Sequence, residues 1–282
     1  MIRKQEIMRH AKLLGLSANT VEKDYVLNWL LLGIFSNVQL NTQWIFKGGT
    51  CLKKCYFKEY RFSEDLDFTL TNAEQLDIDF LNVVFAEIGE WIYEQSGIEI
   101  PEDSIAFESY TNPRGKISVE GKIGYKGPMQ RQSSISRVKL DLTNDELVCT
   151  EPVISELYHP YTDEIPNYDG ILTYSLEEIF AEKTRALAER MRPRDLYDVV
   201  HLYNEKRHEL DVGKYIEIFA AKCEFKNIAI PSFSELSEKA EYQELVSEWD
   251  NMLAHQIGDL ASCQSYWQQL PGVFDWIEGA KI

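Results

Sequence analysis

The spacing of hydrophobic residues changes along the chain from helical to strand-like, which predicts a mixed α+β protein. Helical spacing runs through residues 1–37 and recurs over 75–96, where one apolar face would pack on a sheet. Residues 175–202 continue this pattern and open on two helix-start signals, a capping box at Ser175 and Glu178 and then Pro193. Residues 210–282 also look helical. Their expected core anchors are three tryptophans, Trp249, Trp267 and Trp276.

Short apolar or alternating runs predict a set of strands between these helices. The runs cover residues 44–46, 65–70, 98–100, 105–107, 116–125 and 136–143. Prolines and a glycine punctuate residues 150–172, which we interpret as a loop-rich connector. We therefore expect an N-terminal part, 1–165, with a small mixed sheet flanked by helices, and a helical C-terminal part, 166–282.

The stretch from residue 47 to residue 70 combines a paired glycine with a paired aspartate. Gly48-Gly49-Thr50 follows the apolar run at 44–46, and the spacing after Thr50 predicts a short helix. Asp65, Asp67 and Thr69 then alternate with Leu66, Phe68 and Leu70. This period of two predicts a strand with an apolar face inward and both carboxylates on the other face.

This order of elements predicts a site for a metal–nucleotide complex. Carboxylates at i and i+2 on a strand lie about 6.5 Å apart along the chain and point the same way. Such oxygen ligands suit Mg²⁺ or Mn²⁺. Paired glycines let the backbone approach a ligand, and a helix N-terminus favours phosphate. A lone Gly-Gly is usually a turn and a lone Asp-x-Asp a solvated face; the specificity lies in their combination.

Composition and charge narrow the choice of partners. The formal net charge is −17, so the average field repels nucleic acid, and an RNA partner would need a local basic patch. Residues 116–139 offer one, with Lys122, Lys126 and Arg131 as the acceptor-binding candidates, although a solvated face is an equal interpretation. Five cysteines without C-x-x-C, no long apolar run and no signal-peptide core indicate a cytoplasmic protein that does not span a membrane.

The Gly-Gly-Thr, the short helix and the R-x-S-x-D-x-D of residues 61–67 resemble the DNA polymerase β-like nucleotidyltransferase superfamily. More specifically, roughly the first 200 residues resemble the AbiEii/AbiGii toxins of abortive-infection (phage defence) and toxin–antitoxin systems. The resemblance implies transfer of an NMP from an NTP, with Mg²⁺ or Mn²⁺, to an acceptor hydroxyl. Several family members act on tRNA 3′ ends, and a cognate antitoxin would come from an adjacent gene.

The resemblance also assigns roles to individual residues. Asp141, in the alternating run 136–143, resembles the third carboxylate that joins Asp65 and Asp67 in binding metal and serves the attacking hydroxyl as a base; without the Asp-x-Asp it would be interpreted as a surface ion pair with Lys139. A lysine in a later helix corresponds to Lys183, on an otherwise apolar stripe, where snorkelling is the alternative. The full expected set is catalytic Asp65, Asp67, Asp141 and Lys183, with nucleotide-binding Gly48, Gly49, Thr50, Ser63, Lys183 and either Asp195 or Asp198.

Two other functions fit the same motifs. Nucleotide transfer to a protein hydroxyl needs the same metal and triphosphate groups, so only an acceptor assay separates it from transfer to RNA. A non-catalytic NTP-binding regulator is a different class of protein, and the presence of all three carboxylates argues against it.

Overall fold

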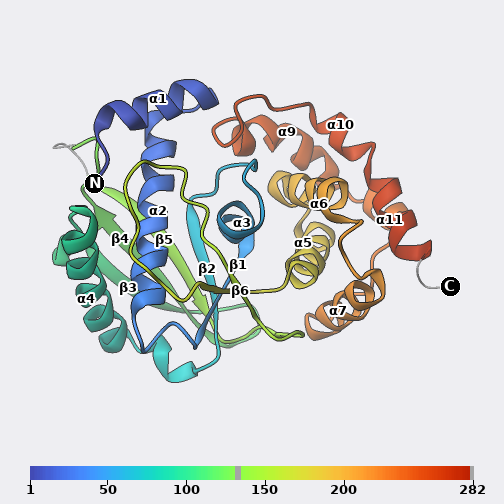
Figure 1. Ribbon diagram of the computed structural model, residues 1–282. Coiled ribbons are helices and arrows are strands. Elements are labelled where there is room, and N and C mark those ends of the chain that lie inside the picture. Colours follow the sequence, from blue (N-terminus) through green and yellow to red (C-terminus); the bar gives the residue numbers. More distant parts are fainter. Residues whose placement is uncertain (131–134, 280–282) are drawn as a thin grey trace. The chain divides into compact units, whose positions relative to one another are not determined.

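The computed structural model describes residues 1–130 and 135–279, and the chain forms two compact units (Figure 1). Unit 1 comprises Met1–Glu146 and Pro152–Thr173. Unit 2 comprises Leu147–Glu151 and Tyr174–Ile282. The chain therefore enters unit 2 briefly at residue 147, returns to unit 1 at 152, and passes into unit 2 again at 174.

Unit 1 is built on a seven-stranded mixed sheet in the order β3-β4-β5-β2-β1-β7-β6. The pairs β2–β5 and β1–β7 are parallel, and the other neighbouring pairs are antiparallel. The strands are β1 (Trp44–Lys47), β2 (Asp65–Leu70), β3 (Ile105–Thr111), β4 (Ile117–Tyr125), β5 (Ser136–Thr143), β6 (Val153–Ser155) and β7 (Ile171–Thr173). The helical segments of this unit are α1 (Lys4–Leu14), α2 (Ala18–Ser36), α3 (Gly48–Cys51), η1 (Leu52–Tyr56), η2 (Ala73–Leu76), α4 (Ile78–Ser96) and η3 (Glu102–Ser104).

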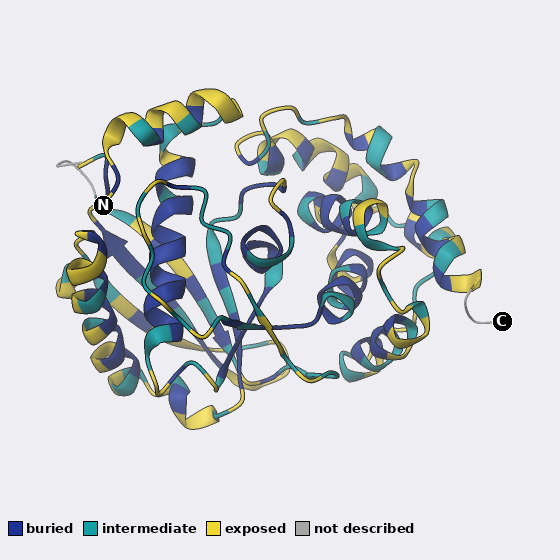
Figure 2. Ribbon diagram, in the orientation of Figure 1, coloured by how far each residue is buried: buried dark blue, intermediate teal, exposed yellow. Residues whose placement is uncertain are grey.

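One face of the sheet is apolar and is covered by α2 and α4. Phe35 of α2 contacts Phe68 of β2 with 6.3 Å between ring centroids, and Phe85 of α4 meets Phe107 of β3 at 5.1 Å. Helix α2 is buried around nearly its whole circumference (Figure 2), as expected for a helix whose sequence is apolar on all sides. Ser17 caps it by accepting a hydrogen bond from the Thr20 amide.

Several local expectations for unit 1 need correction. The connector 150–172 carries β6 and β7, so it extends the sheet rather than being loop throughout. Residues 98–100 form only an isolated bridge, between Glu99 and Lys126. Of the apolar residues expected to pack α4 on the sheet, Val84 and Ile88 are buried, whereas Val83 is 62% exposed; Leu81 and Phe85 join the buried face. Apolar content alone did not determine which side of α4 meets the sheet.

Unit 2 is helical in the residues that the structure describes, which run to 279. Its helices are α5 (Leu176–Arg190), α6 (Pro193–Lys206), α7 (Val212–Phe225), α8 (Phe233–Ser237), α9 (Glu241–Leu253), α10 (Cys263–Trp267) and α11 (Leu270–Gly279). Ser175 caps α5 and Pro193 opens α6, as predicted. The Glu178 carboxylate does not complete the capping box, because it accepts hydrogen bonds from the Cys149 and Thr150 amides instead.

A buried ion pair and a hydrogen bond hold the short segment 147–151 in unit 2. Lys222 of α7 lies 2.8 Å from Glu178 and donates to the Leu147 carbonyl at 2.6 Å. Both charged side chains are almost inaccessible to solvent, so removing Lys222 would leave the Glu178 carboxylate as an uncompensated buried charge. The short segment 147–151 is thus part of the core of unit 2.

The predicted fold class is confirmed: a mixed sheet flanked by helices, followed by a helical C-terminal part. Across residues 1–130 and 135–279, we find no helix that combines the length and the apolar character needed to cross a membrane.

Candidate active site

The predicted strand with two aspartates is confirmed as β2. Asp65 and Asp67 are partly exposed, while Leu66 and Phe68 between and beyond them are fully buried. The alternation arises because Leu66 and Phe68 turn toward the apolar core, which forces the two carboxylates onto the opposite face.

The structure brings Asp141 to the same face as these two aspartates. Strand β5 pairs in parallel with β2, and Asp141 stands directly opposite Asp67. The row continues across the sheet, with Glu120 of β4 opposite Asp141 and Lys47 of β1 opposite Asp67. Since paired residues share a face, three carboxylates from two central strands lie on one surface.

These three side chains have the chemistry of a magnesium site but do not form a closed cage. All are carboxylates, the oxygen donors that Mg²⁺ and Mn²⁺ prefer, so the donor set fits such an ion. Among the described residues, no group of three or more His, Cys, Asp or Glu side chains is gathered tightly enough to hold a metal by itself. Mg²⁺ commonly has few protein ligands and completes its shell with water and substrate phosphates, which agrees with an open arrangement.

Gly48 places the start of α3 directly against Asp67. The helix begins at Gly48 itself, not after Thr50 as the sequence suggested. Gly48 has φ +80°, and a Cβ built there would lie 2.2 Å from Oδ2 of Asp67. Only glycine satisfies both the left-handed backbone and the close approach. The first amides of α3 therefore lie beside the carboxylate face.

The next two residues of α3 contact the segment that leads into β2. A Cβ on Gly49 would come 2.5 Å from the Arg61 guanidinium and 3.3 Å from Oγ of Ser63. The Thr50 hydroxyl donates to the main-chain carbonyl of Asp65, and Thr50 is fully buried. Thr50 thus holds β2 against α3. The phosphate contact expected for Thr50 stays a prediction.

A buried lysine follows in η1, a π-helical turn that continues α3. Lys54 lies 2.7 Å from Asp24 of α2, and Tyr161 donates to the same aspartate at 2.8 Å. Burial lowers the pKa of Lys54 to about 8, although Asp24 opposes this shift. Burial alone would raise the pKa of Asp24, but Lys54, Lys53 and Tyr161 together lower it. Asp24 therefore anchors η1 to α2.

In unit 2 both acidic candidates of α6 already have cationic partners. Lys183 of α5 lies 2.7 Å from Asp198, whose side chain is fully buried. Asp195, equally buried, accepts two hydrogen bonds from Arg190 at 2.7 and 2.9 Å. The structure thus joins Lys183 with Asp198 and leaves Asp195 with a different cation.

Of the predicted acceptor-binding residues, Lys122 is half-buried and Lys126 is exposed, and both form ion pairs with acids. Lys122 lies 3.1 Å from Glu120 and 3.6 Å from Glu108, and Lys126 lies 2.6 Å from Glu99. Arg131 lies outside the described residues. The local charge of this patch is therefore smaller than the sequence count suggested.

Two residues beside the carboxylate face, Tyr110 and Lys47, are not among those that the sequence motifs indicated. The Tyr110 hydroxyl donates to Oδ1 of Asp141 at 2.9 Å, and partial burial with the neighbouring carboxylate raises the pKa of Tyr110. The predicted strand ended at Phe107, whereas β3 runs on to Thr111. Lys47 is buried, and its ammonium lies 3.9 Å from Glu146. A longer strand in the prediction would have placed Tyr110 on the polar face.

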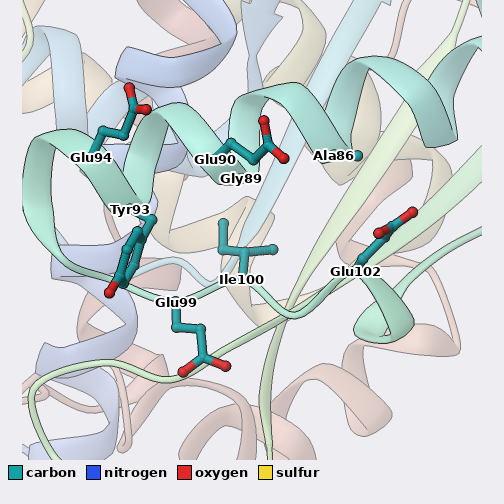
Figure 3. Close-up of a pocket in the computed structure, with 8 residues that line it drawn as sticks. All are labelled: Ala86, Gly89, Glu90, Tyr93, Glu94, Glu99, Ile100 and Glu102. Carbon is teal, nitrogen blue, oxygen red and sulfur yellow. The ribbon is translucent and has the colours of Figure 1, made fainter.

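An acidic hollow lies elsewhere on unit 1, between α4 and residues 99–102 (Figure 3). Its volume is about 450 Å³, and its lining includes Gly89, Ile100 and four glutamates: Glu90, Glu94, Glu99 and Glu102. Like charges repel, so four glutamates make this hollow unsuitable for a triphosphate.

The sheet with paired aspartates on its open face and a glycine-initiated helix beside them has the arrangement that the sequence motifs led us to expect of a nucleotidyltransferase. Residues 29–276 match the family described as nucleotidyl transferase AbiEii toxin, type IV TA system. This match covers most of the chain, which therefore belongs to that family of nucleotidyltransferase toxins in type IV toxin–antitoxin systems. The family implies an NTP substrate and an antitoxin partner.

Solved structures support the fold. MenT4, a nucleotidyltransferase toxin from Mycobacterium tuberculosis H37Rv, superimposes with a TM-score of 0.63 at 16% identity, covering 99% of this chain and 90% of that chain. JHP933 from Helicobacter pylori gives 0.58 at 16% identity, with 94% of both chains covered. A putative nucleotidyltransferase from H. pylori gives 0.59 at 16% identity, covering 94% and 97%. No curated protein matches the chain.

Proposed function

We propose that this enzyme transfers an NMP from an NTP to an RNA hydroxyl, at the 3′ end of tRNA, and that the reaction requires Mg²⁺ or Mn²⁺. The observation that carries the proposal is the common face of Asp65, Asp67 and Asp141, with Gly48 against Asp67. In this proposal the protein acts in the cytoplasm, and its antitoxin comes from an adjacent gene.

In this proposal Asp65, Asp67 and Asp141 hold the metal. When bound, the ion supplies positive charge to the triphosphate and the leaving pyrophosphate. The amides at the start of α3, at Gly48 and Gly49, offer hydrogen bonds to phosphate oxygens, and Ser63 lies beside Gly49. Positioning and charge neutralisation provide most of the catalysis.

The chemical step is a displacement at the α-phosphorus. The acceptor hydroxyl oxygen forms a bond to that phosphorus, the bond to the β-phosphate bridging oxygen breaks, and pyrophosphate leaves. Asp141 is the group proposed to orient the hydroxyl and take its proton. It stands opposite Asp67, so the same carboxylate would serve as base and complete the metal site with Asp65 and Asp67.

Roles for unit 2 and for the basic patch complete the proposal. Lys183 is our candidate for a cation that binds the triphosphate, and its bond to Asp198 would hold the ammonium extended. Asp198 would support that lysine, and Asp195, which binds Arg190, stays a candidate for contacting the nucleotide. Lys122, Lys126 and Arg131 would contact acceptor phosphates, with nearby glutamates limiting their contribution.

The decisive experiment incubates the protein with each α-labelled NTP, Mg²⁺ and total tRNA, in parallel with a protein extract freed of RNA. Label in tRNA that is lost on adding EDTA supports the proposal. Label only in the protein fraction would move the acceptor to a protein hydroxyl. Equal NTP binding by calorimetry with and without EDTA would contradict the metal assignment.

A further inference from the structure

Tyr110 of β3 contacts the proposed site from two strands away. Its side chain lies on the polar face and is 42% exposed, yet its hydroxyl donates to Oδ1 of Asp141 at 2.9 Å. β3 is the outermost strand on this side of the described sheet, next to β4, and β4 lies next to β5. The tyrosine must therefore reach across the whole width of β4.

A small residue makes this reach possible. Ser118 of β4 is the direct register partner of Tyr110, and it is buried. Its short side chain donates to Thr143 of β5, which leaves room for a phenol ring to cross above. A large residue at position 118 would occupy the path from Tyr110 to Asp141.

The neighbour of Asp141 on β4 has other partners. Glu120 stands opposite Asp141 in the sheet and binds Lys139 at 2.6 Å and Lys122 at 3.1 Å. Both lysines thus form ion pairs with Glu120. The Asp141 carboxylate instead accepts its hydrogen bond from a neutral donor, Tyr110, which orients the group without cancelling its charge.

We propose that Tyr110 is a positioning residue: its O–H fixes one oxygen of Asp141, so that the carboxylate has a single orientation for the metal and the acceptor hydroxyl. The inference rests on the proposed function, because it gives Asp141 its role. A hydrogen bond between partly exposed groups adds little to stability. Partners that hold a metal ligand in place, by contrast, matter for metal affinity and activity.

The test compares Tyr110→Phe, which removes the hydroxyl and keeps the ring, with Tyr93→Phe on α4. Tyr93 is more exposed than Tyr110 and lines the acidic hollow, so the control loses the same atom elsewhere on unit 1. Mn²⁺ binding to the full chain is measured by calorimetry without nucleotide, and kcat and KM are measured with tRNA. We expect Tyr110→Phe to lose about tenfold in both Mn²⁺ affinity and kcat, with KM for NTP unchanged.

A double-mutant cycle excludes a merely structural role. Tyr110→Phe should have no further effect on Mn²⁺ affinity once Asp141→Asn is present, since the two residues act as one unit. Wild-type Mn²⁺ affinity in Tyr110→Phe, an equal loss in Tyr93→Phe, or additive losses in the double mutant would each overturn the inference.

Asp67→Asn in the same assays separates this inference from the proposed function. If Asp67→Asn keeps transfer and Mn²⁺ binding, the proposed site itself is wrong. If Asp67→Asn loses both while Tyr110→Phe behaves as wild type, the proposed function stands and the inference about Tyr110 fails.

Discussion

Unit 1 contains carboxylates in two contrasting settings. Asp24 is buried in α2, and its charge is matched by Lys54 at 2.7 Å. Asp65 and Asp67 are partly exposed on β2 and share a face with Asp141. The lysines that flank this face also have other acids near them, Lys47 near Glu146 and Lys139 near Glu120. The first setting uses charge to hold the fold, whereas the second gathers like charges where a cation would bind.

This comparison explains why acids in the two settings receive different roles. Removing one member of a buried ion pair leaves the other charge without compensation, which costs folding free energy. Removing one charge from a cluster of like charges relieves repulsion and costs binding instead. A substitution in the buried ion pair should therefore lower mainly stability. A substitution in the cluster of like charges should lower mainly activity.

The largest expected effect is on activity, from Asp65→Asn or Asp67→Asn. Each amide keeps the shape of the carboxylate and removes the charge that a metal–triphosphate complex needs. Each should reduce transfer by more than about 100-fold, the upper limit typical of outer-shell partners of a metal. The measurements are label transfer to acceptor and growth inhibition in cells.

Glu64→Gln is the matched control for this prediction. Glu64 immediately precedes β2 and lies 2.7 Å from Lys23, so the change removes an acid beside Asp65. It should keep most activity, and the Asp65→Asn/Asp67→Asn double mutant should be little worse than either single mutant. An inactive Glu64→Gln with an active Asp67→Asn would show that the metal ligands are assigned to the wrong residues.

The second effect is on stability, from Lys54→Met. The change leaves Asp24 charged and buried without its lysine, and breaking such a pair typically costs about 3–5 kcal/mol. Denaturant unfolding should show this loss. Lys53→Met is the control: Lys53 is also buried but lies over the Phe62 ring, 3.9 Å from its centroid. If Lys54→Met lowers the free energy of unfolding no more than Lys53→Met does, the contrast between the two settings is wrong.

The third effect, from Lys183→Met, is on both stability and triphosphate binding. The apolar stripe around Lys183 by itself predicts that Lys183→Met stabilises the fold by filling that stripe. The structure instead pairs the lysine with buried Asp198. Lys183→Met should therefore lower stability as well as triphosphate affinity, by calorimetry and by thermal unfolding.

Two further variants separate those losses. Lys183→Met with Asp198→Asn should recover stability without recovering triphosphate binding, because the buried charge is gone but the cation is still missing. Arg190→Met removes the partner of Asp195 and should cost stability alone. Full transferase activity in Lys183→Met would reduce the lysine to a structural role.

The smallest effect should come from reversing the charge of Lys122, Lys126 and Arg131 together. Acceptor binding should weaken while NTP binding is unchanged. The slope of log affinity against log salt should fall by up to about 0.7–0.9 for each acceptor phosphate that the protein no longer neutralises. Reversing Lys4, Arg9 and Lys12 of α1 changes the net charge equally and is the control. An equal decrease in both triple mutants would assign the effect to overall charge.

Local sequence pattern was sufficient to predict the elements that carry the chemistry. The period of two in residues 65–70 placed Asp65 and Asp67 on one face, because Leu66 and Phe68 had to be buried. Ser175 and Pro193 marked helix starts through backbone hydrogen bonding and the fixed φ of proline. Each of these features depends on residues that are near neighbours in the chain.

Contacts between distant residues, in contrast, became visible only in the folded chain. The parallel pairing of β2 with β5 sets Asp141 opposite Asp67. Tyr110 reaches Asp141 across β4, where its direct partner is the small residue Ser118. Neither follows from periodicity, because strand register depends on which strands become neighbours. The burial of Lys54 was equally hidden. A lysine is expected at the surface unless a partner compensates its charge, and that partner, Asp24, lies thirty positions away in the sequence.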